Sequence, residues 1–148
     1  MAGPRFVRFA QAVVLAAPPQ QVFDFVTNAA QWKRWHPATH AVRGAPNRPL
    51  GAGEQVAEQI HAGWRDFEAV WTVAACEPPH LWRIETSTPH GASAVTYRLD
   101  ALGTGCRFER TCEFHSRGAW RLLDGTVARW MLKRQAARAL ANLHALFV

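Results

Sequence analysis

The sequence of 148 residues has few of the features that mark membrane proteins or the common enzyme families. An uninterrupted apolar run long enough to cross a bilayer, about 18 residues or more, is absent. The catalytic signatures GxSxG, HExxH, the P-loop and GxGxxG are also missing. The chain therefore gives no indication of a membrane span, and no catalytic residue can be assigned from a motif.

Cysteine is scarce, and its spacing indicates a reducing, cytoplasmic environment. Cys106 and Cys112 lie six residues apart on one expected strand, a separation of about 20 Å that no disulfide can bridge. No CxxC pair occurs, and two His/Cys pairs with helical spacing contain intervening prolines that would disrupt a shared ligand face: His36/His40 and Cys76/His80. We expect no metal site and no cofactor.

The bulk composition is that of one globular domain covering residues 1–148. Apolar residues make up 49% of the chain and charged residues 19%, which is typical of a folded protein. Residues 10–17 superficially resemble a short signal peptide, but Gln11 interrupts the apolar run and a first strand is the favoured interpretation. Seven tryptophans and eight phenylalanines are many for this length, so the rings either fill a core or line an apolar pocket.

Residues 16–37, AAPPQQVFDFVTNAAQWKRWHP, are the most informative segment. They follow an apolar strand end, and the two prolines suit the first turn of an amphipathic helix. Thr27 and Asn28 then break and re-cap the helix, and Trp32 and Trp35 precede a proline. This order of a strand, two short helices and Trp-x-x-Trp-x-Pro resembles the opening of the START-like or SRPBCC superfamily, which includes polyketide cyclase/dehydrase-like proteins.

The resemblance implies an α+β helix-grip fold. In such a fold a curved antiparallel sheet wraps around a long C-terminal helix, and an apolar ligand lies between them. Five segments with alternating apolar residues predict strands of that sheet, at 54–60, 65–75, 80–87, 92–100 and 105–115. Residues 119–147 are helical by composition.

The lengths of the hairpin loops predict which residues of neighbouring strands oppose each other. The last two loops, taken as four residues each, place Tyr97 opposite Trp82 on one side and Arg110 on the other. The first hairpin places Val56 opposite Trp71, and the Pro-Pro turn places Trp71 opposite Trp82. These registers gather the apolar residues on one covered face and the charged residues on a wet face.

Glu58 and Arg110 are the two charged exceptions on the covered face. A charge there is costly unless it is paired or faces a cavity, and along a flat sheet the two residues would lie about 19 Å apart. Either they present polar groups to a ligand in an apolar cavity, or the register slips locally and their side chains reach water. The sequence leaves both interpretations open.

The C-terminal helix changes its apolar side midway. Trp130 and Met131 fall on one side, whereas Leu140 and Leu143 fall nearly opposite. In the resembled family the middle of this helix closes the cavity, so Val127, Trp130 and Met131 are candidates for a lid, with plain core packing as the alternative. Between 117 and 138 six basic residues face a single acidic one, which allows contact with an acidic partner or simply a solvated face.

These observations predict the binding of a small hydrophobic or aromatic, lipid- or polyketide-like ligand with an oxygen-rich end, in a cavity of about 300 Å³ or more. The alternatives are a cyclase or dehydratase acting in the same cavity and an interaction protein that uses the basic helix. No nucleic acid is expected, and a homodimer is allowed. The candidate ligand-binding residues are Trp35, Glu58, Phe67, Trp71, Trp82, Tyr97, Phe108, Arg110, Val127, Trp130 and Met131.

Overall fold

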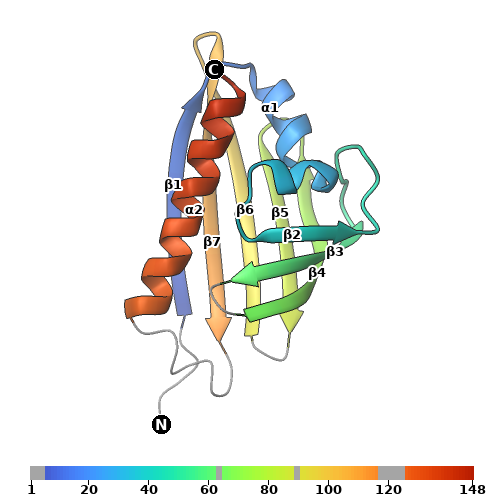
Figure 1. Ribbon diagram of the computed structural model, residues 1–148. Helices are drawn as coiled ribbons and strands as arrows, with labels where there is room; N and C mark the ends of the chain where they lie inside the picture. Colours follow the sequence, from blue (N-terminus) through green and yellow to red (C-terminus); the bar gives the residue numbers. More distant parts are fainter. Residues whose placement is uncertain (1–5, 63–64, 89–90, 117–125) are drawn as a thin grey trace.

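The computed structural model confirms the predicted α+β helix-grip architecture (Figure 1). Seven antiparallel strands form one curved sheet in the order β1-β7-β6-β5-β4-β3-β2. The long C-terminal helix α2 (Thr126–Leu146) lies in front of the β1 and β7 side of this sheet. The residues that the structure describes are 6–62, 65–88, 91–116 and 126–148.

The strands of the sheet are β1 (Phe6–Leu15), β2 (Thr39–Arg43), β3 (Gln55–Ala62), β4 (Arg65–Glu77), β5 (Leu81–Thr88), β6 (Gly91–Leu102) and β7 (Gly105–Ser116). Two short helices, α1 (Pro19–Val26) and the 3-10 helix η1 (Ala29–Arg34), connect β1 to β2 as the sequence predicts. Residues 119–125 of the expected C-terminal helix lie outside the described part of the chain.

The segment between α1 and η1 forms as its residues predict. Pro19 opens α1, and Val22, Phe23 and Val26 are buried on its inner face. The Asn28 side chain accepts a hydrogen bond of 3.1 Å from the backbone N–H of Ala30 and so caps η1. After this cap, Trp32 within η1 and Trp35 at its end are both buried in the core.

Three of the four predicted strand registers are confirmed. Tyr97 pairs with both Trp82 and Arg110, and Val56 pairs with Trp71. The predicted pairing of Trp71 with Trp82 is wrong, because Trp82 pairs with Cys76. The prediction that Trp71 and Trp82 lie on the covered face of the sheet is nevertheless correct.

The cause lies in the Pro-Pro turn and a bulge in β4. Pro78 and Pro79 have no N–H to donate to a strand ladder, so the β4–β5 hairpin closes at Glu77 and Leu81. A register shift between Val73 and Ala75 then restores the alternation. Val73 therefore pairs with Ile84 on the covered face, where Trp71 also lies buried.

Helix α2 packs against the concave side of the sheet through its second half. Ala136, Ala139, Leu140 and Leu143 are buried there, which confirms the predicted packing side of this half. The backbone N–H of Ala16 donates to the carbonyl of Phe147 over 3.2 Å. The end of α2 is therefore tied to the end of β1.

Candidate functional site

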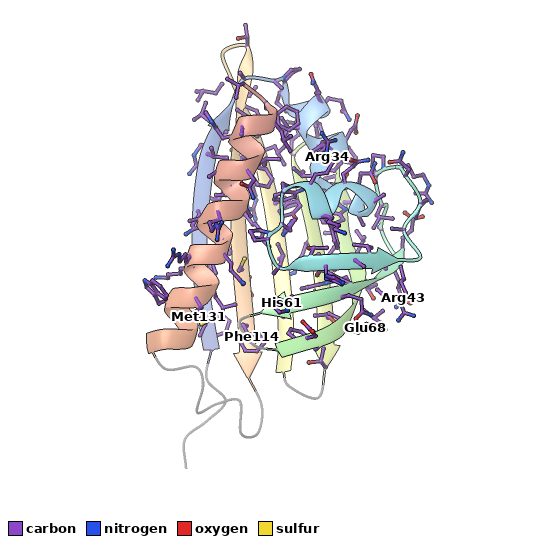
Figure 2. The ribbon with its side chains drawn as sticks, viewed as in Figure 1. Arg34, Arg43, His61, Glu68, Phe114 and Met131 are labelled. Carbon is purple, nitrogen blue, oxygen red and sulfur yellow. The ribbon has the colours of Figure 1, made fainter. Side chains whose placement is uncertain are left out.

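The concave face of the sheet is divided into a packed end and a half-buried end. At the packed end, beneath α1 and η1, the side chains of Trp35, Trp82, Leu99, Cys106 and Phe108 are at most 1% exposed. The half-buried end is formed by concave-face residues of β3 to β7, all of intermediate exposure: Ile60, Phe67, Thr86, Ser93, Cys112 and Phe114. Figure 2 shows Phe114 and Met131 together at this lower end, whereas Arg34 lies at the other.

The packed end is a continuous aromatic cluster. The ring of Tyr97 stacks on Trp82 with 5.2 Å between centroids and lies 5.1 Å from Phe108. Trp35 contacts the same group, 6.1 Å from Tyr97 and 6.2 Å from Phe108. Four of the candidate ligand-binding residues, Trp35, Trp82, Tyr97 and Phe108, are thus largely enclosed by one another.

Glu58 is buried on the concave face and fully engaged in hydrogen bonds. The Thr39 hydroxyl bonds to its Oε2, and the Trp71 indole N–H donates to its Oε1 over 2.9 Å. Burial raises the pKa of Glu58, while the bonds from Thr39 and Trp71 and the charge of Arg110 oppose that rise. With 7% exposure, Glu58 does not reach water, so the snorkelling interpretation is wrong for this residue.

Arg110 lies on β7 directly opposite Tyr97, and its guanidinium interacts with the phenolic hydroxyl. Its guanidinium also interacts electrostatically with Glu58. The two residues would be far apart on a flat sheet, so the curvature of the strands between β3 and β7 brings their charges within range (Figure 1). The curvature that the sequence leaves undetermined thus couples the only two charged residues on the concave face of β3 and β7.

His36 joins this group from the end of η1. Its Nε2 lies 3.4 Å from the Tyr97 hydroxyl, and its ring lies 3.8 Å from the Trp35 ring. Burial and then the charge of Arg110 lower the pKa of His36 well below its usual value, so it is neutral at physiological pH. Burial also raises the pKa of Tyr97, which keeps the phenol neutral.

Several buried polar atoms in and around this group have no hydrogen-bond partner among the described residues. Arg110 Nε and Trp35 Nε1 are donors, and Gln11 Oε1 and Thr86 Oγ1 can accept. Gln11 pairs with Arg110 across β1 and β7, and its amide N–H donates to the Lys133 carbonyl of α2. Unpaired buried polar atoms are rare in folded proteins and call for an explanation.

The candidate lid residues differ in their placement. Met131 is half-buried, whereas Trp130 is 59% exposed with the Arg134 guanidinium 5.2 Å from its ring centroid. This placement does not support Trp130 as a lid residue. The side chain of Val127 lies outside the described residues.

Two members of the polar group were missed in the sequence. Thr39 lies on β2, a five-residue edge strand that the sequence does not predict, since THAVR has no clear apolar alternation. Gln11 is noted in the sequence only as an interruption of an apolar run. That interruption is the one sequence signal that could have placed a polar group beside Arg110.

A pocket of about 330 Å³ lies outside the concave face, where β1, the β6–β7 turn and the end of α2 meet. Val14, Leu102 and Phe147 contribute apolar walls, and Thr104 and His144 contribute polar atoms. It is therefore not the cavity predicted between sheet and helix, whose volume stays a prediction.

The described residues contain no group of three or more His, Cys, Asp or Glu side chains that could hold a metal ion. Among the same residues, no helix has both the length and the apolar character needed to cross a bilayer.

Comparisons with solved structures find the same fold. A START superfamily protein from Mycobacterium smegmatis superimposes with a TM-score of 0.78 at 10% identity, covering 95% of this chain and 96% of that one. An aromatase/cyclase, Zhui, from a Streptomyces species gives 0.71 at 17% identity, with 93% and 88% covered. A Rhodobacter sphaeroides protein gives 0.71 at 18% identity, with 94% and 90% covered.

At these identities the likeness shows the fold alone. A search of curated proteins finds no significant match. The sequence itself matches the family described as polyketide cyclase/dehydrase and lipid transport over residues 7–148. This match covers nearly the whole chain and agrees with the START-like resemblance of residues 16–37. The chain belongs to the polyketide cyclase/dehydrase and lipid transport family.

Proposed function

We propose that the protein binds a small apolar or aromatic molecule between the half-buried end of the concave face and α2. The oxygen-rich end of the ligand contacts Arg110, and its apolar body lies against side chains such as Ile60 and Phe67. The family supports a hydrophobic ligand. The observation that carries the proposal is the buried Nε of Arg110, which has no acceptor among the described residues.

A guanidinium keeps its charge in proteins and binds oxygen acceptors in a fixed geometry. Where the packed end meets the half-buried end, Arg110 combines a donor that has no partner among the described residues with the neighbouring Tyr97 hydroxyl. The surrounding concave-face residues are mainly apolar, so an oxygen acceptor on an apolar body suits both parts of the site. We propose no ligand contact for the aromatic cluster other than through Tyr97.

The test uses two fluorescent probes with the same aromatic body. Anilinonaphthalene sulfonate carries an oxyanion, and N-phenylnaphthylamine lacks it. In Arg110→Met the sulfonate probe should bind more weakly by roughly 1.5–3 kcal/mol, the range for hydrogen bonds to charged groups. The neutral probe should keep its affinity, because methionine preserves the length and apolar character of the side chain.

Arg107→Met is the matched control, since Arg107 lies on the same strand and is exposed on the opposite face. It should change neither affinity. Failure of both probes to bind the wild-type protein, together with no small molecule retained in native mass spectrometry, would contradict the proposal. Equal weakening of both probes in Arg110→Met would make Arg110 structural.

A cyclase or dehydratase on the same site is the second candidate. The observation that favours it is a buried carboxyl, Glu58, in electrostatic contact with Tyr97 and Arg110. Such groups could move a proton and polarise a carbonyl of a polyketide-like substrate. Turnover of a polyketide mimic that is lost in Glu58→Gln, with probe binding retained, would support this candidate over simple binding.

A further inference from the structure

Resting on the proposed ligand site, we propose that the ligand binds as an anion, a carboxylate or a similar oxyanion, and that Glu58 takes up a proton as the anion binds. The proposal goes beyond an oxygen-rich ligand end because it fixes the charge of the ligand. It also assigns Glu58 a role in binding.

The surroundings of Glu58 suit both of its protonation states. As a carboxylate it accepts hydrogen bonds from Thr39 and Trp71. As a carboxylic acid it can still accept from the Trp71 indole on Oε1, while the Thr39 hydroxyl reverses its role and accepts the new proton on Oε2. Neither state leaves a carboxyl oxygen of Glu58 without a partner, so the proton can arrive without rearrangement of the strands.

Few of the groups around Glu58 can compensate a change in its charge. Directly opposite it lie Val42 of β2 and Ala69 of β4. Across the concave face, Arg110 of β7 and Tyr97 of β6 interact with it electrostatically.

Other titratable or charged groups lie on the neighbouring elements. His36 and Cys112 interact with Arg110 rather than with Glu58. Among the α2 side chains that the structure describes, the charged and titratable ones are exposed: Lys133, Arg134, Arg138 and His144. Among the described concave-face groups that ionise, Glu58 and Arg110 are therefore the pair that carries opposite charges.

An anion bound to Arg110 upsets this balance. Before binding, the negative charge of Glu58 offsets the positive charge of Arg110. After binding, two negative charges would share one cation, and neighbouring like charges favour protonation of one acid. Arg110 cannot change its charge, so Glu58, which burial already pushes toward the acid form, takes the proton.

The test counts protons by isothermal titration calorimetry of the full chain in two buffers with different heats of ionisation, between about pH 5 and pH 9. The sulfonate of the anionic probe stays charged over this range, so any proton taken up belongs to the protein. Binding of anilinonaphthalene sulfonate should be accompanied by uptake of up to about one proton, and its affinity should fall by up to about tenfold per pH unit above the pKa of Glu58. N-phenylnaphthylamine should bind without proton uptake.

Glu58→Gln should bind the sulfonate probe without proton uptake and with an affinity that no longer depends on pH. Glu85→Gln, an exposed carboxyl on the opposite face, should behave like the wild type. Uptake that persists in Glu58→Gln would assign the proton to another group, such as His36, and overturn the proposal.

The comparison of the two probes on the wild-type protein needs no variant, so the test holds even if Glu58→Gln does not fold. Binding of the sulfonate probe without proton uptake at any pH would contradict the inference. Binding of the neutral probe alone would do so as well, but would leave the proposed apolar site intact. Absence of binding for both probes would instead contradict the proposed function.

Discussion

At the scale of single residues, the charges on the covered face are more informative than the aromatic side chains. Of the four tryptophans that suggest a ligand site in the sequence, Trp35 and Trp82 pack into the aromatic cluster of the packed end, and Trp130 is exposed. Glu58 and Arg110, which break the apolar pattern, lie instead between the packed end and the half-buried end. Buried charges persist only where structure or function compensates their desolvation, so such exceptions mark a site better than a count of rings does.

His36 should make folding sensitive to acid. Burial and Arg110 lower its pKa in the folded state, whereas in the unfolded chain a histidine titrates near pH 6.5. Below that pH the unfolded chain binds a proton at His36 and the folded protein does not. The contribution of His36 to the free energy of unfolding is therefore complete above about pH 6.5 and is lost as the pH falls. At one pH unit below the unfolded pKa, the expected loss of folding free energy is at most about 1.4 kcal/mol.

His36→Phe keeps a ring against Trp35 and cannot titrate, so this loss should disappear. Urea unfolding at pH 7.5 and at pH 5.5, compared between variant and wild type, measures the difference. The exposed His40 provides the control substitution His40→Phe, which should retain the acid sensitivity. An unchanged pH dependence in His36→Phe would show that His36 is accessible to protons in the folded state.

At the scale of elements, the junction of β1 with the β6–β7 hairpin leaves no room for a side chain at Gly105. A Cβ there would lie 2.2 Å from the backbone carbonyl oxygen of Leu15. Because both groups belong to paired strands, neither can move without disturbing the β1–β7 ladder. Gly105→Ala should therefore destabilise the protein by roughly 2–4 kcal/mol.

Gly51→Ala is the matched control. A Cβ at Gly51 would meet only the Glu54 carboxylate at 3.8 Å, an ordinary contact, so little change is expected. The free energy of unfolding in urea measures both variants. A small effect of Gly105→Ala would mean that the backbone at the end of β1 can shift at little cost to make room for the added methyl group.

The same elements show how far the sequence determines the fold. The registers of the three hairpins without a bulge follow from loop length alone, so both partners of Tyr97 and the β3 partner of Trp71 could be predicted. The β4–β5 pairing could not, because the bulge between Val73 and Ala75 absorbs a residue that no local pattern marks. β2 could not be predicted either, since its five residues depend on pairing with β3 rather than on their own periodicity.

For the candidate site, the sequence predicts the residues but not their distances. Alternation along the strands places Glu58 and Arg110 on one face. Their electrostatic contact depends on the curvature of the whole sheet, which accumulates over the intervening strands and has no local signature. The role of Gln11 likewise depends on α2, more than a hundred residues away in the sequence.

At the scale of the whole molecule, one end of the concave face stabilises the fold and the other end forms the proposed binding site. The packed end holds the largest fully buried side chains, the half-buried end holds partly exposed apolar residues, and the polar group lies between them. A protein that binds a ligand between sheet and helix needs this division, because a face packed along its whole length would leave no surface for the ligand. Substitutions at the packed end should therefore lower folding stability more than ligand affinity, and substitutions at the half-buried end should do the reverse.

Leu99→Ala and Ile60→Ala test this division. Leu99 is 0% exposed at the packed end, so its truncation should cost about 2–5 kcal/mol of folding free energy without changing the affinity for N-phenylnaphthylamine. Ile60 is half-buried at the other end, so Ile60→Ala should cost only about 1 kcal/mol of stability. The same substitution should weaken the probe about tenfold, because it removes apolar surface from the proposed site. Urea unfolding and fluorescence titration of both variants separate the two effects, and a loss of probe affinity in Leu99→Ala with none in Ile60→Ala would move the ligand to the packed end.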